Sequence, residues 1–273
     1  MNLLPGRNEA HRQGHSRRGL TLTELVVVLT ILVALGGLIV PMLPNFLAKT
    51  HFAKCSTTIP EMNKLWITSF TSDVKYPDGY DSLQSAPGVL FANLPGGDAG
   101  GEVLAGTITA DQADALRAIG VTRVYDHTVA NSGNVTLDSV PNDPTGDTLG
   151  RLLAADQNVA LLNPLGPSVV SLGIDVAKYT DNGNTDVDFV VLGVGNNCSA
   201  VGPRGLMVEA PTHFGGENDM NPVDFYQRYC VVFAVSDEGA DSAAEFVCAC
   251  SIHPDGFDGA EAHIRAYYED QQD

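Results

Sequence analysis

The segment from Arg17 to Pro41, RRGLTLTELVVVLTILVALGGLIVP, constrains the fold of this chain more than any other. No residue from Leu25 to Val40 is charged, and Glu24 is the one carboxylate at the start of the apolar run. With Leu20 to Thr23 added, a helix here is roughly 30 Å long at 1.5 Å per residue, enough to cross the hydrocarbon of a bilayer. We therefore expect residues 20–44 to form a helix that spans a membrane.

Glu24 is unusual in such a segment. A carboxylate in an apolar membrane helix is costly unless it lies near the interface or is paired, so it indicates a functional role. The competing interpretation is an ordinary membrane anchor with its carboxylate at headgroup depth.

The residues around Glu24 favour the functional interpretation. Gly19-Leu20-Thr21-Leu22-Thr23-Glu24, followed by the aliphatic run, resembles the N-terminal cleavage and methylation motif of type IV pilins and type II secretion pseudopilins. The resemblance implies that a prepilin peptidase cuts between Gly19 and Leu20 and methylates the new terminus. It also implies that Glu24 pairs with the amino terminus of a neighbouring subunit during assembly.

The resemblance further implies an architecture. We expect a pilin-like α+β fold, in which a long N-terminal transmembrane helix packs on an antiparallel β-sheet and a large insertion, residues 71–167, lies between helix and sheet. Three parts follow: a leader that is removed (1–19), a transmembrane and polymerisation helix (20–44), and an extracytoplasmic globular domain (45–273). Within the helix, Gly36, Gly37 and Pro41 weaken the backbone hydrogen bonds and form the segment that melts on assembly.

The function expected from this resemblance is structural. The chain is a subunit, a minor pilin or a pseudopilin, of a type IV pilus or a type II secretion pseudopilus. Its partners are a prepilin peptidase, other pilin or pseudopilin subunits, an inner-membrane assembly platform and membrane lipid. The alternatives are a membrane-anchored ligand-binding protein that does not polymerise and an anchored hydrolase.

Charge predicts location. The chain has 15 Lys and Arg against 33 Asp and Glu, a net charge of −18, yet four arginines and only one glutamate precede Leu20. Basic residues before the span and an acidic body after it predict a single-pass membrane protein with a cytoplasmic N-terminus and an extracytoplasmic body. The resemblance implies that the membrane is the inner membrane and that the protein is later found in a filament, in the periplasm or at the cell surface. The acidic body argues against nucleic acid as a partner.

Several elements are predicted after the span. Apolar residues recur with helical spacing at Phe52, Cys55, Ile59, Met62, Trp66 and Phe70. Pro60 predicts a kink or a break in that helix. Inside 71–167 we expect a helix that begins at the N-cap Thr109 and ends at Gly120, then a short strand, and a second short helix over 149–157.

Two hairpins are predicted beyond this region. Asn182-Gly183 is a strong turn signal between strands over 169–179 and 185–195. A second hairpin joins strands at 230–235 and 245–252, and the tail over 261–269 fits a strand or a short helix.

Candidate chemistry outside the N-terminus is weak. Asp181, Asn184, Asp186 and Asp188 alternate like calcium ligands, but the glycine that a twelve-residue calcium loop needs is missing, so no cofactor is expected and calcium is only a weak alternative. Cys198, Cys230, Cys248 and Cys250 are disulfide candidates, with Cys230 expected to pair with Cys248 or Cys250 and Cys55 expected to stay unpaired. The sequence has neither GxSxG nor HExxH, so we expect no catalytic residues and no enzyme.

Overall fold

The structure is a computed structural model that describes residues 21–39, 43–86, 88–91, 94, 102–125, 151–153, 156–179, 187–212, 226–236, 244–253 and 256–269. The chain divides into two compact units, Met1–Phe46 and Leu47–Asp273.

The first unit holds helix α1, Leu22–Ile39, which has 18 residues. Helix α2, Leu43–Asp73, begins in this unit and continues through the second. No helix within the described ranges combines the length and the apolar character that crossing a membrane requires. The predicted membrane-spanning helix over 20–44 and the predicted single-pass inner-membrane location are therefore wrong.

The second unit is built on a nine-stranded sheet. Seven strands pair in the order β11-β10-β9-β8-β1-β5-β6. Strand β7 also pairs with β8, and β4 pairs with β7. The strands are β1 Tyr80–Asp81, β4 Val103–Thr107, β5 Arg123–Tyr125, β6 Arg151–Leu152, β7 Asn158–Leu162, β8 Val187–Gly193, β9 Cys230–Ser236, β10 Glu245–His253 and β11 Gly256–Asp258. Among the described strands of this sheet, β1 and β5 pair in parallel and the other pairs are antiparallel. Strands β2, Gln84–Ala86, and β3, Val89–Leu90, form a separate two-stranded sheet.

The central strands are buried on both faces. Along β8, Val190 and Leu192 belong to one apolar cluster, while Phe189 and Val191 belong to another on the opposite face. Strand β9, CVVFAVS, alternates in the same way and is buried along its whole length. Two-sided burial explains why β9 and the stretch Phe189–Leu192 of β8 are continuous apolar runs rather than alternations of apolar and polar residues.

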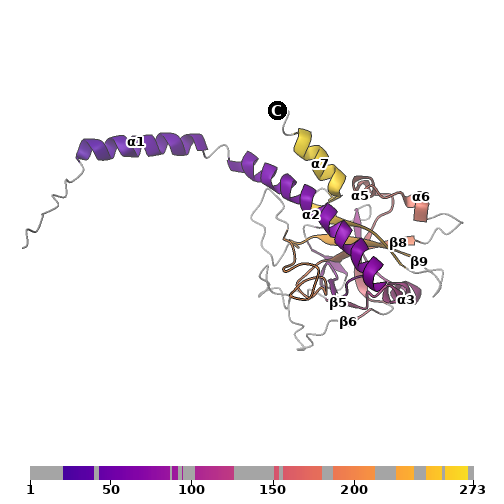
Figure 1. Cartoon of the computed structure of the whole chain (residues 1–273). Helices are drawn as coiled ribbons and strands as arrows, with labels where there is room; N and C mark the ends of the chain where they lie inside the picture. The colour runs from indigo at the N-terminus through magenta and orange to yellow at the C-terminus, as the bar shows by residue number, and fades with distance from the viewer. Residues whose placement is uncertain are drawn as a thin grey trace, which may run out of the picture. The chain divides into compact units, whose positions relative to one another are not determined.

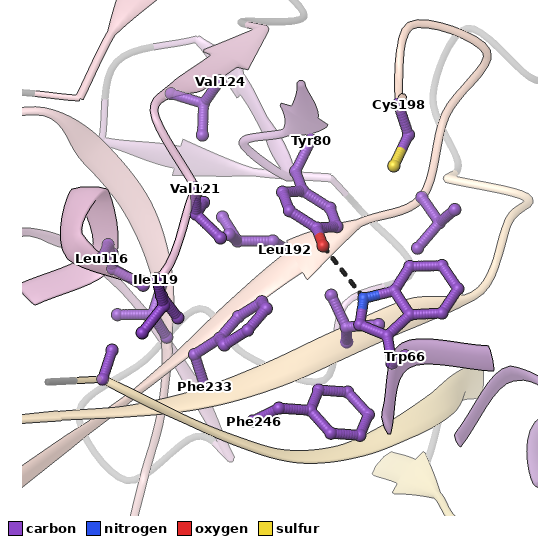
Figure 2. Packing of buried hydrophobic residues seen from close by; sticks show 14 of the residues in the cluster. Trp66, Tyr80, Leu116, Ile119, Val121, Val124, Leu192, Cys198, Phe233 and Phe246 are labelled. Carbon is purple, nitrogen blue, oxygen red and sulfur yellow. Dashed lines mark hydrogen bonds between the residues drawn. The ribbon is translucent and has the colours of Figure 1, made fainter. Parts of the chain in front are cut away.

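Helices α2 and α3 cover one face of this sheet (Figure 1). On α2 the fully buried residues are Cys55, Ile59, Met62 and Trp66, which is the spacing expected from the sequence. Figure 2 shows the centre of the cluster, where the indole N–H of Trp66 donates to the hydroxyl of Tyr80 over 2.9 Å. The backbone N–H of Ala249 on β10 also donates to the side chain of Asn63 over 2.6 Å, which ties α2 to the sheet.

The opposite face carries shorter elements. Leu83, Phe91 and Leu94 pack there together with Val169 of helix α5, Pro167–Ser171, and with residues of helix α6, Val176–Tyr179. The last helix, α7, Ala260–Glu269, follows β11 and buries His263 against Ser251 of β10.

The predicted pilin-like arrangement, a long transmembrane helix on a sheet with an insertion between them, is contradicted. Residues 71–167 are not an insertion, because they supply β1, β4, β5, β6 and β7 to the main sheet. The body is a mixed α/β fold in which a largely antiparallel sheet is covered on both faces.

Other local predictions are wrong in whole or in part. Helix α2 continues through Pro60, so the break expected as one alternative there does not occur, whereas the kink stays a prediction. Residues 151–152, expected in a short helix, form β6. Instead of the first strand of the predicted Asn182-Gly183 hairpin, residues 167–179 form α5 and α6, and β8 pairs with β7, β9 and β1; the turn itself lies outside the described residues.

Other local predictions are confirmed. Helix α3, Ala110–Ala118, has Thr109 as its N-cap, with Gly120 at a φ of 98° beyond its end. Strand β5 follows it, and β9 and β10 form the expected antiparallel pair. The tail is helical.

Candidate assembly site

The N-terminus of α1 is closed by a reciprocal set of hydrogen bonds between Thr21 and Glu24. The backbone N–H of Thr21 donates to Oε2 of Glu24 over 2.8 Å, and the Thr21 hydroxyl donates to the same oxygen over 3.0 Å. In return, the backbone N–H of Glu24 donates to the Thr21 hydroxyl oxygen over 3.3 Å. This is a capping box, which satisfies backbone donors that the first helical turn otherwise leaves without partners.

The capping box changes the electrostatics of Glu24. The hydrogen bond from the Thr21 backbone, followed by the one from its hydroxyl, lowers the pKa of the Glu24 carboxyl below its ordinary value. The carboxylate is therefore ionised at neutral pH and lies at the positive end of the helix dipole, where negative charge is favourable.

The rest of α1 presents apolar side chains to its surroundings on every side. Five consecutive residues, Leu25 to Leu29, are each at least 50% exposed, and at about 100° per residue they surround the helix axis. Leu22, Ile31, Leu32, Val33 and Leu35 are also exposed. Helices that are apolar all round are normally buried, so a surface of this kind is unusual for a helix that stays in water.

The glycines predicted to weaken the helix lie near its end. Gly36 and Gly37 belong to α1, and a Cβ added at either would meet no atom within 4 Å. Neither glycine is therefore required by close packing within this chain. Gly19, Leu20 and Pro41 lie outside the described residues, so their predicted roles stay predictions.

The weak calcium candidate is not assembled by the described residues. Asp188 on β8 accepts a hydrogen bond from the Gln112 side chain of α3 over 2.7 Å, which gives it a structural role. Asp181, Asn184 and Asp186 lie outside the described residues. Within the described ranges no group of three or more His, Cys, Asp or Glu side chains is placed to hold a metal ion.

The five cysteines are divided between the two faces of the sheet, and the structure holds no disulfide bond among them. Cys55 and Cys198 are buried in the cluster that contains Trp66, whereas Cys230, Cys248 and Cys250 lie in the cluster on the other face. Burial raises the pKa of Cys55 to about 11 and that of Cys198 to about 12. Both thiols are therefore protonated and unreactive at neutral pH.

One serine–histidine contact bears on the alternative of a hydrolase. Ser251 Oγ lies 2.7 Å from Nε2 of His263, but neither residue is more than 1% exposed. A nucleophile must reach its substrate, and α7 covers this one, so the contact serves to hold α7 on the sheet. The absence of enzymatic activity stays a prediction.

Sequence reasoning assigned Glu24 and missed Thr21. The signal was present as Thr21-Leu22-Thr23-Glu24, which matches the pattern of a threonine followed three residues later by a glutamate at a helix start.

The sequence matches no protein-family model, and neither a curated protein nor a solved structure similar to the chain was found.

Proposed function

We propose that this chain is a subunit of a pilin-type filament, processed between Gly19 and Leu20 and assembled through α1. The observation that carries the proposal is the all-round exposure of the apolar side chains of α1, with its single carboxylate at the N-terminal end. Copies of the same helix, packed side by side, cover such a surface on all sides at once. The motif from Gly19 to Glu24 supports the same assignment, because it resembles that of prepilins.

Glu24 has a specific part in this function. Packing α1 against other helices removes Glu24 from water, and an ionised carboxylate in an apolar environment is strongly unfavourable without a partner. Cleavage after Gly19 creates an α-ammonium group at Leu20, a charge of the opposite sign. Pairing between Glu24 of one copy and this ammonium of the next relieves the cost and fixes the axial position of each subunit.

The first test is processing. We expect mass spectrometry of the mature protein to give Leu20 as its first residue, carrying a methyl group. A mature protein that begins upstream of Arg17 contradicts the proposal.

The second test is assembly of Glu24 variants. Glu24→Val is expected to leave the body folded while filament incorporation falls at least tenfold, measured by shearing the producing cells and comparing filament-bound with cell-bound protein. Glu24→Asp keeps the charge on a shorter side chain and should incorporate better than Glu24→Gln, which has no charge. Glu61→Val, an exposed position on α2, is the matched control and should incorporate normally. Normal incorporation of the Glu24→Val protein would rule out the assigned role.

A further inference from the structure

Three cysteines gather on one face of the sheet, and a shift in the register of β10 separates them from Phe246. Phe246, Cys248 and Cys250 occupy alternate positions of β10, so a regular strand would place all three side chains on one face. The register of β10 against β9 shifts between Phe246 and Cys248, as it does at a β-bulge. As a result, Phe246 lies with Trp66 on one face, while Cys248 and Cys250 lie with Cys230 on the other.

The same shift selects one pair among the three. Cys250 stands directly opposite Cys230, whereas Cys248 stands opposite Val232. Directly opposed residues of antiparallel strands have Cα atoms about 4.5–5.5 Å apart, within the range of about 4.4–6.8 Å found in disulfides. Cys248 is diagonal to Cys230, where the separation of about 7–8 Å exceeds that range.

The remaining pairings are excluded by the fold. Cys248 and Cys250 occupy positions i and i+2 of one extended strand, so their side chains run parallel and their Cβ atoms lie roughly 6.6 Å apart. A disulfide requires Cβ atoms about 3.5–4.5 Å apart. Cys55 and Cys198 lie across the sheet in the other cluster. Among the three cysteines of this face, only Cys230 and Cys250 therefore have the geometry of a disulfide.

We infer that Cys230 and Cys250 form a disulfide that links β9 to β10. In this reaction the two thiols lose two protons and two electrons, and one S–S bond forms. The oxidant is the disulfide of a thiol–disulfide oxidoreductase or of a small molecule, which accepts the protons and electrons and is reduced to two thiols. The inference is independent of the proposed function.

Burial fixes when this reaction takes place. Cys230 and Cys250 are both 0% exposed, and burial raises the pKa of each thiol well above its ordinary value. The attacking species in thiol–disulfide exchange is the thiolate, which must also reach the oxidant. The disulfide therefore forms during folding, before the opposite face of the sheet is covered, and once formed it resists reductants as long as the body stays folded.

The experiment is thiol counting on the full-length wild-type protein. Protein purified without reductant is unfolded in guanidinium chloride that already contains excess N-ethylmaleimide, at near-neutral pH so that free thiols react before disulfides exchange, and its mass is measured. We expect three alkyl groups on the five cysteines. Five alkyl groups would overturn the inference.

Peptide mapping then identifies the pair. Trypsin leaves Cys230, Cys248 and Cys250 in one peptide, because neither Lys nor Arg occurs between Arg228 and Arg265. A glutamate-specific protease cuts after Glu238 and Glu245, which separates Cys230 from the other two. Fragmentation should then find Cys230 joined to Cys250 and Cys248 alkylated; a link to Cys248 would overturn the register argument.

Variants supply a second readout. Cys250→Ala should lower the melting temperature of the unreduced protein by roughly 5–10 °C. Reducing the protein in denaturant and refolding it before the measurement should lower the melting temperature of the wild type, but it should not change that of Cys250→Ala. Cys248→Ala is the matched control on the same strand face and should keep the dependence on reduction. Equal behaviour of the two variants would contradict the inference, whatever their absolute stability.

Discussion

At the scale of single residues, Thr21 and Glu24 show how one carboxylate can serve two states. In the free chain the Glu24 carboxylate closes the helix end through Thr21. In the proposed filament it faces the ammonium group of another copy. The Thr21 contacts keep the carboxylate ionised and oriented before the partner arrives, and they use only one of its two oxygens among the contacts described.

A titration of Glu24 tests the capping box. Because the pKa of Glu24 in the folded state is lowered, its contribution to the helix end is present above the ordinary glutamate pKa and is lost as the pH falls through the lowered value. Thr21→Val removes the hydroxyl and keeps the backbone donor, so the pKa should move part of the way back up. Carboxyl NMR of Glu24 measures both values, with Thr21→Ser as the control that retains the lowered pKa. An unchanged pKa in Thr21→Val would contradict the role of the hydroxyl.

Val74 offers a test of backbone strain. It follows α2 at a φ of 57°, in the left-handed region, while its N–H donates to Phe70 over 2.9 Å and its side chain is 69% exposed. The left-handed conformation costs a β-branched residue about 1–2 kcal/mol, and glycine is preferred there. Val74→Gly should therefore raise the free energy of unfolding by about 1 kcal/mol, measured by urea denaturation. Val74→Ala keeps a Cβ and should gain less; an equal gain would contradict the argument.

At the scale of elements, the sequence predicted the helices and strands whose boundaries and buried residues are encoded within their own segments. Helix α3 has its N-cap, its buried Leu116 and, beyond its end, the buried Ile119 and a glycine; strand β9 and the stretch Phe246–Cys250 of β10 are apolar runs. By contrast, strands such as β1 and β6 have only two residues, and they exist because neighbouring strands pair with them. No local pattern can encode such strands, so the region that supplies them read as an insertion.

The false hairpin has a different cause. Apolar residues over 169–176 fit alternation, but Val169, Leu172 and Val176 fit helical spacing equally well. Pro167 at the start of α5 and Gly173 beyond its end, at a φ of 68°, are helix boundary signals that decide between the two. The strong turn dipeptide outweighed them in the prediction.

Pro60 provides the prediction at this scale. It lies exposed inside the continuous helix α2, where proline has no N–H to donate to the carbonyl of Ser56 and is about 3 kcal/mol less favourable than alanine. Proline also restricts the unfolded chain, which offsets about 1 kcal/mol of that difference. Pro60→Ala should thus raise the free energy of unfolding by about 2 kcal/mol in urea. Glu61→Ala, its exposed neighbour, is the control and should change stability by less than about 0.5 kcal/mol; a destabilising Pro60→Ala would show that the helix needs the proline.

At the scale of the whole molecule, the candidate site and the body could be predicted from the sequence to different extents. Glu24 and the apolar segment after it are contiguous in sequence, so the candidate site was visible without a fold. The two-sided burial of β8 and the register that opposes Cys230 to Cys250 depend on contacts between distant segments. These could not be derived from local patterns.

Net charge gives the last prediction. Processing after Gly19 removes four arginines and one glutamate, which leaves 11 basic residues against 32 acidic ones in the mature chain. Two like charges 10 Å apart in water repel by about 0.4 kcal/mol before screening, and many such pairs exist on a body this acidic. Compaction brings these charges together, so their repulsion destabilises the folded state relative to the unfolded chain.

Salt should therefore stabilise the mature protein. Raising sodium chloride from about 0.1 to 1 M shortens the Debye length from about 10 to about 3 Å, which screens most of this repulsion. We expect the urea midpoint to rise across this range, and urea is the suitable denaturant because it is uncharged. Potassium chloride at the same concentration should have the same effect, since screening depends on ionic strength. A variant that neutralises three exposed carboxylates should raise the urea midpoint at low salt and flatten its dependence on salt. The three substitutions are Glu61→Gln, Asp73→Asn and Glu209→Gln. A midpoint that stays constant or falls with salt would mean that the acidic residues are already compensated within the fold.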